Sequence, residues 1–412
     1  MARTLNRASF PCCPGMWEDC RMLSTYVVGD EVLDSLDLKV ALLTRGVFVH
    51  DEVYERFEGT YRFSRNPLEC SALLLPDGAV VHLAAIGPGA RFHLKLDGRK
   101  RPCLFRGEQQ VSEVSFPPKS DFYNQTTSRG IPFRGLAVLQ GCDVLSFPYL
   151  WPCELAQSGL ACKFCHCGNF TRQQVLDGTY REMPYTARDV ADVVDYAVNV
   201  ERCARYIQIT GGSTVGGDGE CDRHVEILRA IDDVAGLRSI EGEIVLFATP
   251  PADPTDIDKL FAAGADRVAC DIEIWDENLA SEICPGKSSV TGRERHLNAL
   301  DHIAATQGRN KGCSTFVVGL EPVESFLAGA DYLARRGIVP VPSIWMPHGL
   351  PVATELAPPA LEFYRQMKKG LARIYSTYGC EPPGGAGFNV CLCRDTWTHR
   401  HELVSLQERR PE

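Results

Sequence analysis

Residues 206–212 read Tyr-Ile-Gln-Ile-Thr-Gly-Gly, a short apolar strand that ends in a pair of glycines. On both sides of this stretch, short apolar runs alternate with segments that have the apolar periodicity of a helix. Upstream, Thr186 can cap a helix whose valines lie on one stripe, and downstream a helix is expected around residues 224–235. Strands that alternate with helices are typical of parallel β-α-β units.

The same alternation extends from about residue 134 to residue 377. The sequence predicts strands over residues 136–139, 206–209, 244–247, 267–274, 314–318 and 339–345. It predicts helices that begin at Thr186 and that cover residues 224–235, 256–263, 293–306, 325–336 and 360–377. Six units are fewer than the eight of a closed barrel, so we expect an α/β fold built on an open, partial (β/α)6 barrel. The chemistry of such folds lies at the carboxyl ends of the strands.

The first 130 residues have the texture of short strands and turns. Two apolar runs flank Pro76-Asp77-Gly78, a turn in which glycine supplies a positive φ, and residues 91–96 alternate between apolar and polar side chains. Residues 117–130 are expected to be a linker. The chain is therefore predicted to have three parts: a β-rich N-terminal domain over residues 1–130, the barrel core over residues 131–355, and a C-terminal helix with a short cysteine-containing extension over residues 356–412.

Composition restricts the class of protein further. Of 412 residues, 44% are hydrophobic and 23% are charged, values that are typical of a folded chain. The net charge of −10 argues against a nucleic-acid partner. The N-terminus lacks the apolar segment of a secretion signal, and no apolar run approaches the ~18 residues that span a bilayer. We therefore expect a cytoplasmic protein without a membrane partner, in which the 18 cysteines are reduced.

Five of these cysteines fall in one stretch of 26 residues: Cys142, Cys153, Cys162, Cys165 and Cys167. Cys162 and Cys165 form a C-x-x-C pair, a spacing that lets two thiolates reach one metal centre from a single turn. Iron–sulfur clusters and zinc ions are both held in this way, and the same spacing occurs in redox-active dithiols. The stretch is thus a candidate metal or cluster site.

Cys162-Lys163-Phe164-Cys165 resembles the second half of the radical S-adenosylmethionine (SAM) signature, C-x3-C-x-Φ-C, in which Φ is aromatic. In that superfamily the motif follows the first strand of a partial barrel. The usual spacing would place the first cysteine at position 158, which is Ser158. The nearest upstream cysteine is Cys153, which gives C-x8-C-x2-C. The resemblance implies that Cys153, Cys162 and Cys165 hold a [4Fe–4S] cluster. Cys142 and Cys167 are alternatives to Cys153 as the first ligand.

The resemblance covers roughly residues 134–350 and also implies a SAM site. The cluster would cleave SAM to a 5′-deoxyadenosyl radical, with one electron from a donor such as flavodoxin or ferredoxin. Gly211-Gly212-Ser213-Thr214 resembles the Gly-Gly-Glu-type motif that contacts the SAM amino group, with Ser213 in place of the acidic residue. The residues expected to contact SAM are Phe164, Gly211, Gly212, Ser213, Thr214, Glu273 and Glu321.

Several of these positions have a structural alternative. Asp271 and Glu273 alternate on one predicted strand, and Glu273 could pair with Arg293 or Arg295 instead of SAM. Glu321 could serve only as the cap of the next helix. Lys287 follows Cys284-Pro285-Gly286 and is expected either to pair with a carboxylate of SAM or substrate or to lie on the surface. His348 follows the last strand and is expected either to face the substrate or to have a structural role.

A second group of thiols lies near the C-terminus. Cys380, Cys391 and Cys393 flank a loop rich in glycine and proline. Three thiols at this spacing could hold an auxiliary iron–sulfur cluster or zinc, with a fourth ligand from Cys12, Cys13 or Cys20. The alternative is that they are ordinary buried cysteines, which pack as small apolar side chains.

The resemblance implies a radical SAM enzyme that acts on a small-molecule substrate. Hydrogen-atom abstraction would start a rearrangement, a bond cleavage or a methylation. Two alternatives use the same thiols: a peptide-modifying radical SAM enzyme with an auxiliary cluster, and a zinc-binding or iron–sulfur redox sensor that is not an enzyme.

Overall fold

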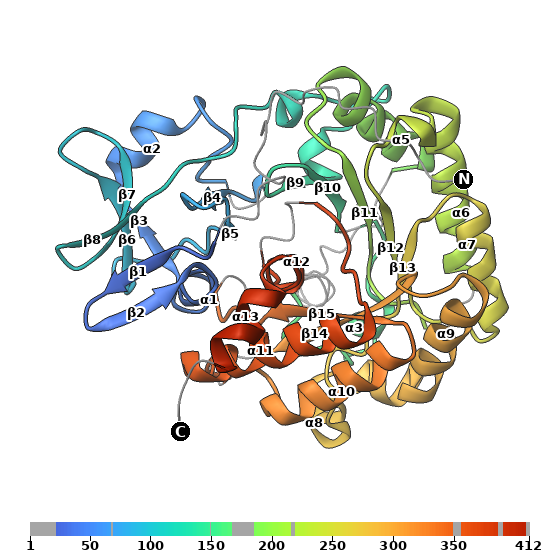
Figure 1. Cartoon of the computed structure of the whole chain (residues 1–412). Helices are drawn as coiled ribbons and strands as arrows, with labels where there is room; N and C mark the ends of the chain where they lie inside the picture. The colour runs from blue at the N-terminus through green and yellow to red at the C-terminus, as the bar shows by residue number, and fades with distance from the viewer. Residues whose placement is uncertain are drawn as a thin grey trace.

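The computed structural model describes residues 22–66, 69–148, 150–166, 185–215, 219–348, 356–385 and 390–408. A curved seven-stranded sheet forms its centre, in the order β15-β14-β13-β12-β11-β10-β9 (Figure 1). The strands are β9 (Val138–Gln140), β10 (Val144–Phe147), β11 (Tyr206–Ile209), β12 (Ile244–Phe247), β13 (Arg267–Ala269), β14 (Gly312–Val318) and β15 (Val339–Ile344). Neighbours from β10 to β15 pair in parallel, which confirms the predicted partial barrel.

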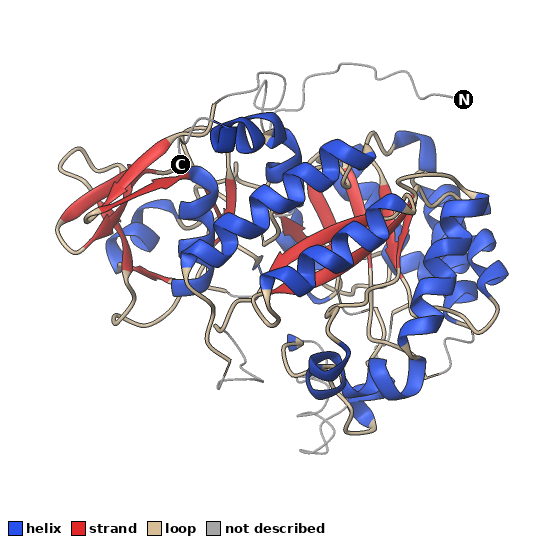
Figure 2. Ribbon diagram, turned by 60° about the horizontal axis from the view of Figure 1, so that its bottom comes forward, coloured by secondary structure: helices blue, strands red, loops and turns tan. Residues whose placement is uncertain are grey.

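Helices α5, α6, α7, α9 and α10 lie on the outer face of this sheet (Figures 1 and 2). Their burial follows the apolar stripe of each helix, as on α5, where Val190, Val193 and Val194 are fully buried. The helices of this part are α3 (Glu154–Gln157), α5 (Ala187–Asp195), α6 (Glu220–Val234), α7 (Asp258–Ala262), α8 (Glu277–Ile283), α9 (Arg293–Thr306), α10 (Val323–Arg335) and α11 (Leu361–Tyr378), with π-helical turns at Tyr196–Val200 and Lys287–Thr291. Of these, α3 and α8 were not predicted. No helix in the described part of the chain has the length and apolar composition needed to cross a membrane.

The first parallel strand is β10 rather than the predicted strand at residues 136–139. The earlier apolar run forms β9, which pairs antiparallel with β10 across a turn at Gly141, whose φ is +54°. An apolar run shows that a strand is buried but not which way it runs, so the sequence pattern fitted either strand. Cys142 lies in this turn, at the amino end of the parallel strands, and packs against Ala72, Leu74 and Val80.

The N-terminal part contains strands and also two helices that were not predicted. The hairpin expected around Pro76-Asp77-Gly78 is confirmed as β4 and β5, with Gly78 at a φ of +95°. Helix α1 begins after Asp34, whose side chain caps the Asp37 N–H. The elements are β1 (Thr25–Val28), β2 (Glu31–Asp34), α1 (Ser35–Arg45), β3 (Val47–Val49), α2 (Asp51–Phe57), β4 (Ala72–Leu74), β5 (Val80–His82), β6 (Phe92–Leu96), β7 (Pro102–Arg106) and β8 (Gln109–Glu113). The domain boundaries at 130 and 355 stay predictions.

The stretch expected to be a linker is fixed to the barrel. Phe122 is fully buried, and the Thr127 hydroxyl donates to Asp189 Oδ1 at 2.9 Å. Arg129 forms an ion pair with the same carboxylate at 2.7 Å. Asp189 also completes the capping box that begins α5 at Thr186. One buried carboxylate therefore joins the segment that leads into the barrel to the first barrel helix.

The C-terminal extension closes two open parts of the barrel. At the amino ends of the strands, Arg267 donates to the Glu381 carbonyl at 2.5 Å, and Gly384 N donates to Glu243 at 2.9 Å. Further on, Ile344 N donates to the Val390 carbonyl at 3.0 Å, so the chain continues beside the outer edge of β15. The chain then ends in α12 (Cys393–Thr398) and α13 (Arg400–Glu408). Covering a strand edge in this way prevents it from pairing with another molecule.

Candidate active site

A cavity of about 220 Å³, here called the mouth cavity, lies at the carboxyl ends of the parallel strands. Pro148, Thr210 and Ala248 follow directly after β10, β11 and β12 and line its wall. This is the end of the barrel where the sequence predicted the chemistry. The lining also includes Cys153, Leu155, Cys162, Phe164, Cys165, Gly211, Gly212, Ser213, Glu220, Phe247, Thr249, Asp271, Glu273, Lys287, Thr291 and His296.

The three cysteines expected to hold a cluster all line the mouth cavity. Cys165 N donates to the Cys162 carbonyl at 3.1 Å, which makes the C-x-x-C segment a tight turn. Burial raises the pKa of the Cys153 thiol. Within the described ranges, no three His, Cys, Asp or Glu side chains form a group that could hold a metal ion. The thiols therefore share one cavity without forming a closed site, and Cys167 lies outside the described residues.

The alternative ligand Cys142 is not part of this cavity. It is buried in the β9–β10 turn, where the Arg62 guanidinium donates to the neighbouring Gly141 carbonyl. Because this turn precedes β10, it lies at the opposite end of the strand from the mouth cavity. The structure therefore removes Cys142 from the candidate ligands.

Gly211 and Gly212 allow two chain segments to approach closely. A Cβ on Gly211 would overlap the Trp151 ring, and a Cβ on Gly212 would overlap the Cys153 backbone. The two segments are also hydrogen bonded, since the Trp151 indole donates to the Gly212 carbonyl at 2.6 Å and Glu154 N donates to the Ser213 carbonyl at 3.0 Å. The glycines thus position the Cys153 segment, a contact that the sequence motif did not indicate.

Glu220 is a cavity residue that the sequence did not single out. Its buried carboxylate accepts a hydrogen bond from the Thr214 hydroxyl at 2.7 Å and one from Thr249 N at 2.7 Å, and burial raises its pKa. Thr214, predicted to contact SAM, is outside the lining and holds Glu220 instead. The sequence feature that could have indicated Glu220 is its position as an acidic residue at the start of the helix that follows the glycine pair.

His224 lies one helical turn below Glu220 and is fully buried. Its Nε2 is 3.9 Å from Glu220 Oε1, and its ring packs edge to face on Trp151 with centroids 4.8 Å apart. The Phe247 backbone also approaches the imidazole. Burial lowers the pKa of His224 to about 4, so the imidazole is neutral at pH 7.

Glu273 pairs with Lys287 rather than with the predicted Arg293 or Arg295. Lys287 Nζ donates to Glu273 Oε1 at 2.5 Å and to the Asp271 carbonyl at 3.0 Å. Burial raises the pKa of Glu273, although the Lys287 ammonium opposes this shift. Arg293 bonds to the Trp275 carbonyl and stacks on its ring. Lys287 thus pairs with a carboxylate of the protein itself.

β13 is shorter than predicted, and the backbone that follows it is irregular at Glu273. Glu273 has a φ of +69°, a left-handed conformation that is costly for a residue with a side chain. The regular strand ends at Ala269, and a single bridge joins Glu273 to Phe316. Asp271 and Glu273 still both line the mouth cavity, as their alternation predicted. Residues with strained backbone conformations are found most often at functional sites.

Glu321 does not line the mouth cavity, and its contact with SAM stays a prediction. Its carboxylate accepts hydrogen bonds from the backbone of Trp275 at 2.9 Å and Asp276 at 2.9 Å and from the Ser325 hydroxyl at 2.6 Å. These three hydrogen bonds supply donors to the buried carboxylate, and two of the donors, Trp275 and Asp276, are distant from Glu321 in the sequence. Phe164 does line the cavity. His348 Nε2 donates to the Thr44 carbonyl at 3.1 Å and so contacts α1.

The predicted three-thiol site at the C-terminus is not assembled. Cys391 and Cys393 have sulfur atoms 2.9 Å apart, but Cys380 packs in a different cluster, the main core. Cys380 follows the end of α11, whereas Cys391 lies beside β15. The candidate fourth ligands Cys12, Cys13 and Cys20 lie outside the described residues.

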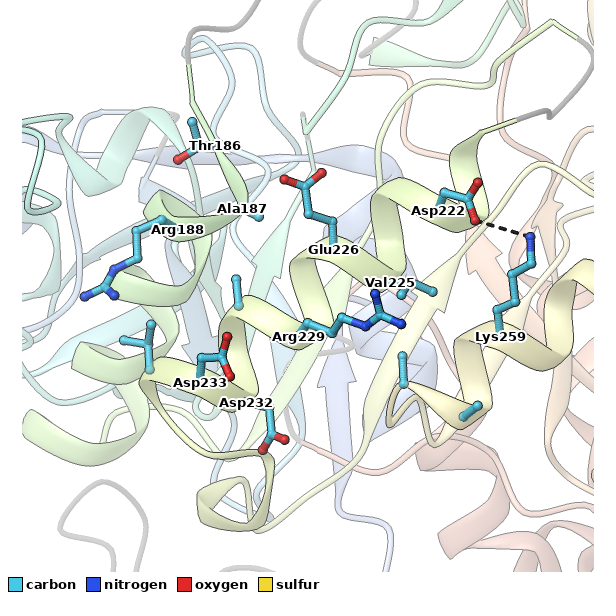
Figure 3. Close-up of a pocket in the computed structure, with 14 residues that line it drawn as sticks. Thr186, Ala187, Arg188, Asp222, Val225, Glu226, Arg229, Asp232, Asp233 and Lys259 are labelled. Carbon is cyan, nitrogen blue, oxygen red and sulfur yellow. Dashed lines mark hydrogen bonds and ion pairs between the residues drawn. The ribbon is translucent and has the colours of Figure 1, made fainter.

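A larger open groove of about 960 Å³ lies on the outside of the barrel, between α5, α6 and α7 (Figure 3). Its rim carries charges of both signs, and Lys259 Nζ contacts Asp222 Oδ1 at 3.3 Å across it. None of the predicted site residues lines this groove. The groove therefore lacks the thiols and the buried carboxylates that distinguish the mouth cavity.

Comparisons with known proteins agree with the position of the site. Residues 159–333 match the family model of the radical SAM superfamily, a segment that contains Cys162 and Cys165 but begins after Cys153. Bacteriochlorophyllide c C-7(1)-hydroxylase of Chlorobaculum limnaeum is 23% identical over 266 residues. The match covers 61% of this chain and 64% of the hydroxylase, slightly less than two thirds of its length.

Two solved structures are also similar. HydG, a maturase of the [FeFe]-hydrogenase, is 14% identical, with a TM-score of 0.43 over 58% of this chain and 51% of that chain. A radical SAM methyltransferase from Sphaerobacter thermophilus is 16% identical, with a TM-score of 0.40 over 61% of this chain and 69% of that chain. The family match spans the strands and helices around the mouth cavity. Residues 159–333 thus match the radical SAM superfamily, and this match, with the similarity to a hydroxylase, supports an enzyme whose reaction is unspecified.

Proposed function

We propose that the chain holds a [4Fe–4S] cluster on Cys153, Cys162 and Cys165 and binds SAM in the mouth cavity. The observation that carries this proposal is that these three thiols line one cavity together with the Gly211-Gly212 turn and the buried carboxylates of Glu220 and Glu273. When bound, the cluster would supply the electron that cleaves SAM to methionine and a 5′-deoxyadenosyl radical.

The donor set of the cavity suits such a cluster. Iron–sulfur clusters are held by cysteine thiolates, and three thiols leave one iron open for another ligand. The Gly212 contact fixes the Cys153 segment against the turn after β11. Lys163 N donates to the Ile283 carbonyl at 2.8 Å and so fixes the C-x-x-C segment against α8. Both halves of the ligand set are therefore attached to rigid elements, as a binding site requires.

The carboxylates of the cavity suit a cationic ligand. Glu220 takes the place of the acidic residue that is missing at Ser213, because it reaches the same cavity from the next helix. Its hydrogen-bond donors, Thr214 and Thr249, are neutral, so a bound ammonium group would supply its cation. Glu273 already has Lys287, and this pair would contact the ribose or carboxylate of SAM.

We propose a small molecule as the substrate and a reduced flavodoxin or ferredoxin as the electron donor. The similar hydroxylase of Chlorobaculum limnaeum acts on bacteriochlorophyllide c, a small molecule. Hydroxylation is a further outcome of hydrogen-atom abstraction, beside rearrangement, cleavage and methylation. We also propose that the N-terminal part, residues 1–130, binds or covers the substrate, since α1 contacts the end of β15 through His348.

The test is anaerobic reconstitution followed by reduction in the presence of SAM. We expect Cys→Ala substitutions at positions 153, 162 and 165 each to abolish both the visible absorption of the cluster and the release of 5′-deoxyadenosine. Cys142→Ala is the matched control and should retain both. Loss of the cluster in Cys167→Ala, with Cys153→Ala still active, would contradict the assignment of Cys153. A protein that binds only zinc would refute the proposed function itself.

A further inference from the structure

Cys391 and Cys393 form a buried pair of thiols inside the barrel. Their sulfur atoms are 2.9 Å apart, and the side chains are 3% and 0% exposed. They pack against inward-facing side chains of the sheet, namely Val245, Ala269, Cys313, Val339 and Val341. Phe247 packs on the same cluster and also lines the mouth cavity, so the cluster that holds the pair adjoins the cavity.

The surroundings make the two sulfur atoms chemically different. Lys39 is 1% exposed and its ammonium bonds to Asp395 Oδ2 at 2.7 Å, two residues beyond Cys393. Burial alone would raise the pKa of Cys391, but the hydrogen bond from Cys393 and the charge of Lys39 outweigh it and lower that pKa. Burial raises the pKa of Cys393. Cys391 is therefore the better nucleophile, because the thiolate is the reactive form.

We propose that Cys391 and Cys393 form a reversible dithiol–disulfide couple that exchanges two electrons with low-molecular-weight disulfides. The Cys391 thiolate attacks one sulfur of the small disulfide, whose S–S bond breaks and releases one thiol. The Cys393 thiolate then attacks the Cys391 sulfur, forms the Cys391–Cys393 bond and releases the second thiol. The protein loses two electrons and two protons, and the small disulfide gains them.

The geometry favours this couple over a metal site. A metal would need further ligands, and among the described side chains no third His, Cys, Asp or Glu joins the two sulfurs in a group that could hold one. A disulfide across one intervening residue closes a very short loop, which stabilises a fold little and suits a reversible bond. The backbone on either side is also anchored, since Leu392 N donates to the Pro342 carbonyl at 3.2 Å and Cys393 begins α12.

The experiment uses the anaerobic, cluster-containing full chain, equilibrated in buffers of graded ratios of reduced to oxidised glutathione. After acid quenching and alkylation, trypsin releases the peptide Ile374–Arg394, which carries Cys380, Cys391 and Cys393. We expect tandem mass spectrometry to find Cys380 alkylated and the Cys391–Cys393 segment lighter by two hydrogen atoms at oxidising ratios. Adding reduced glutathione should restore two alkylated thiols.

Two variants sharpen the assignment. Cys380→Ser should leave the oxidised fraction unchanged at every ratio, whereas Cys393→Ser should stop at a mixed disulfide of glutathione on Cys391. The proposal is overturned if both thiols of the wild-type pair remain alkylated at all ratios, if the disulfide joins Cys380 to either of them, or if the pair retains zinc. These readouts do not depend on SAM cleavage, so they stand or fall separately from the proposed function.

Discussion

Substituting Gly212 by alanine tests whether the close approach of two segments positions Cys153. An added Cβ would overlap the Cys153 backbone and lie 2.5 Å from the Pro152 carbonyl carbon. Ordinary contact begins at 3.4 Å, so the Pro152–Cys153 backbone must retreat by at least the difference, 0.9 Å. The neighbours are backbone atoms, which cannot turn aside as a flexible side chain would.

A retreat of this size exceeds the tolerance of a binding site. Constellations of ligands must be held within about 0.5 Å of their productive geometry, and a misplacement of about 1 Å can cost on the order of 100-fold in rate. The shift also weakens the hydrogen bond from Gly212 N to the Trp151 carbonyl, which is 2.9 Å long. We therefore expect Gly212→Ala to incorporate less iron and to release 5′-deoxyadenosine about 100-fold more slowly.

The assay measures iron per chain, visible absorption after reconstitution and the rate of SAM cleavage. Gly135→Ala is the matched control, because a Cβ there meets no atom within 4 Å and its φ is not in the left-handed region. The control should behave as the wild type. A Gly212→Ala protein with full iron content and an unchanged rate would refute the inference that this contact positions Cys153.

Three further predictions concern buried titratable groups. Glu220→Gln should raise the dissociation constant for SAM about tenfold or more, since hydrogen bonds to charged groups contribute ~1.5–3 kcal/mol. The control Glu226→Gln, at an exposed position, should leave this constant unchanged. If equilibrium binding gives the same dissociation constant for Glu220→Gln and the wild type, the role of Glu220 is contradicted. Lys287→Met leaves Glu273 without its cation and should lower the free energy of unfolding by about 3–5 kcal/mol. Chemical denaturation should show partial recovery in Lys287→Met/Glu273→Gln, and no recovery would exclude the lost pairing as the cause. The folded-state pKa of His224, about 4, lies below its unfolded value near 6.5, so its contribution is present above pH 6.5 and is lost as the pH falls towards 4. Between pH 7 and pH 5 the free energy of unfolding of the wild type should fall by about 2 kcal/mol, and that of His224→Phe should not show this loss. If the free energies of unfolding of the two proteins change in parallel with pH, this account is contradicted.

The secondary structure around the mouth cavity was largely readable from the sequence because its signals are local. Residues 244–247 and helix α9 have the predicted bounds, since apolar periodicity and turn residues act over a few positions. The α5 cap at Thr186 depends only on Asp189, three residues away. The C-x-x-C spacing likewise placed Cys162 and Cys165 in one turn, because two intervening residues allow few other arrangements.

The sequence could not give the partners that the chain brings together from afar. Lys287 rather than Arg293 meets Glu273, and the Trp275 and Asp276 backbone meets Glu321. Residue type indicates that a buried carboxylate needs donors, but not which donors reach it.

By itself the sequence determined the alternation of strands and helices and the concentration of thiols at residues 153–165, since both are written in neighbouring positions. Only the tertiary structure decided that β9 runs antiparallel and removes Cys142 from the site, that Glu220 enters the mouth cavity from α6, and that Cys391 meets Cys393 without Cys380. The physical reason is that side chains meet through the path of the folded backbone. That path depends on the packing of the whole core, which no short stretch of sequence encodes.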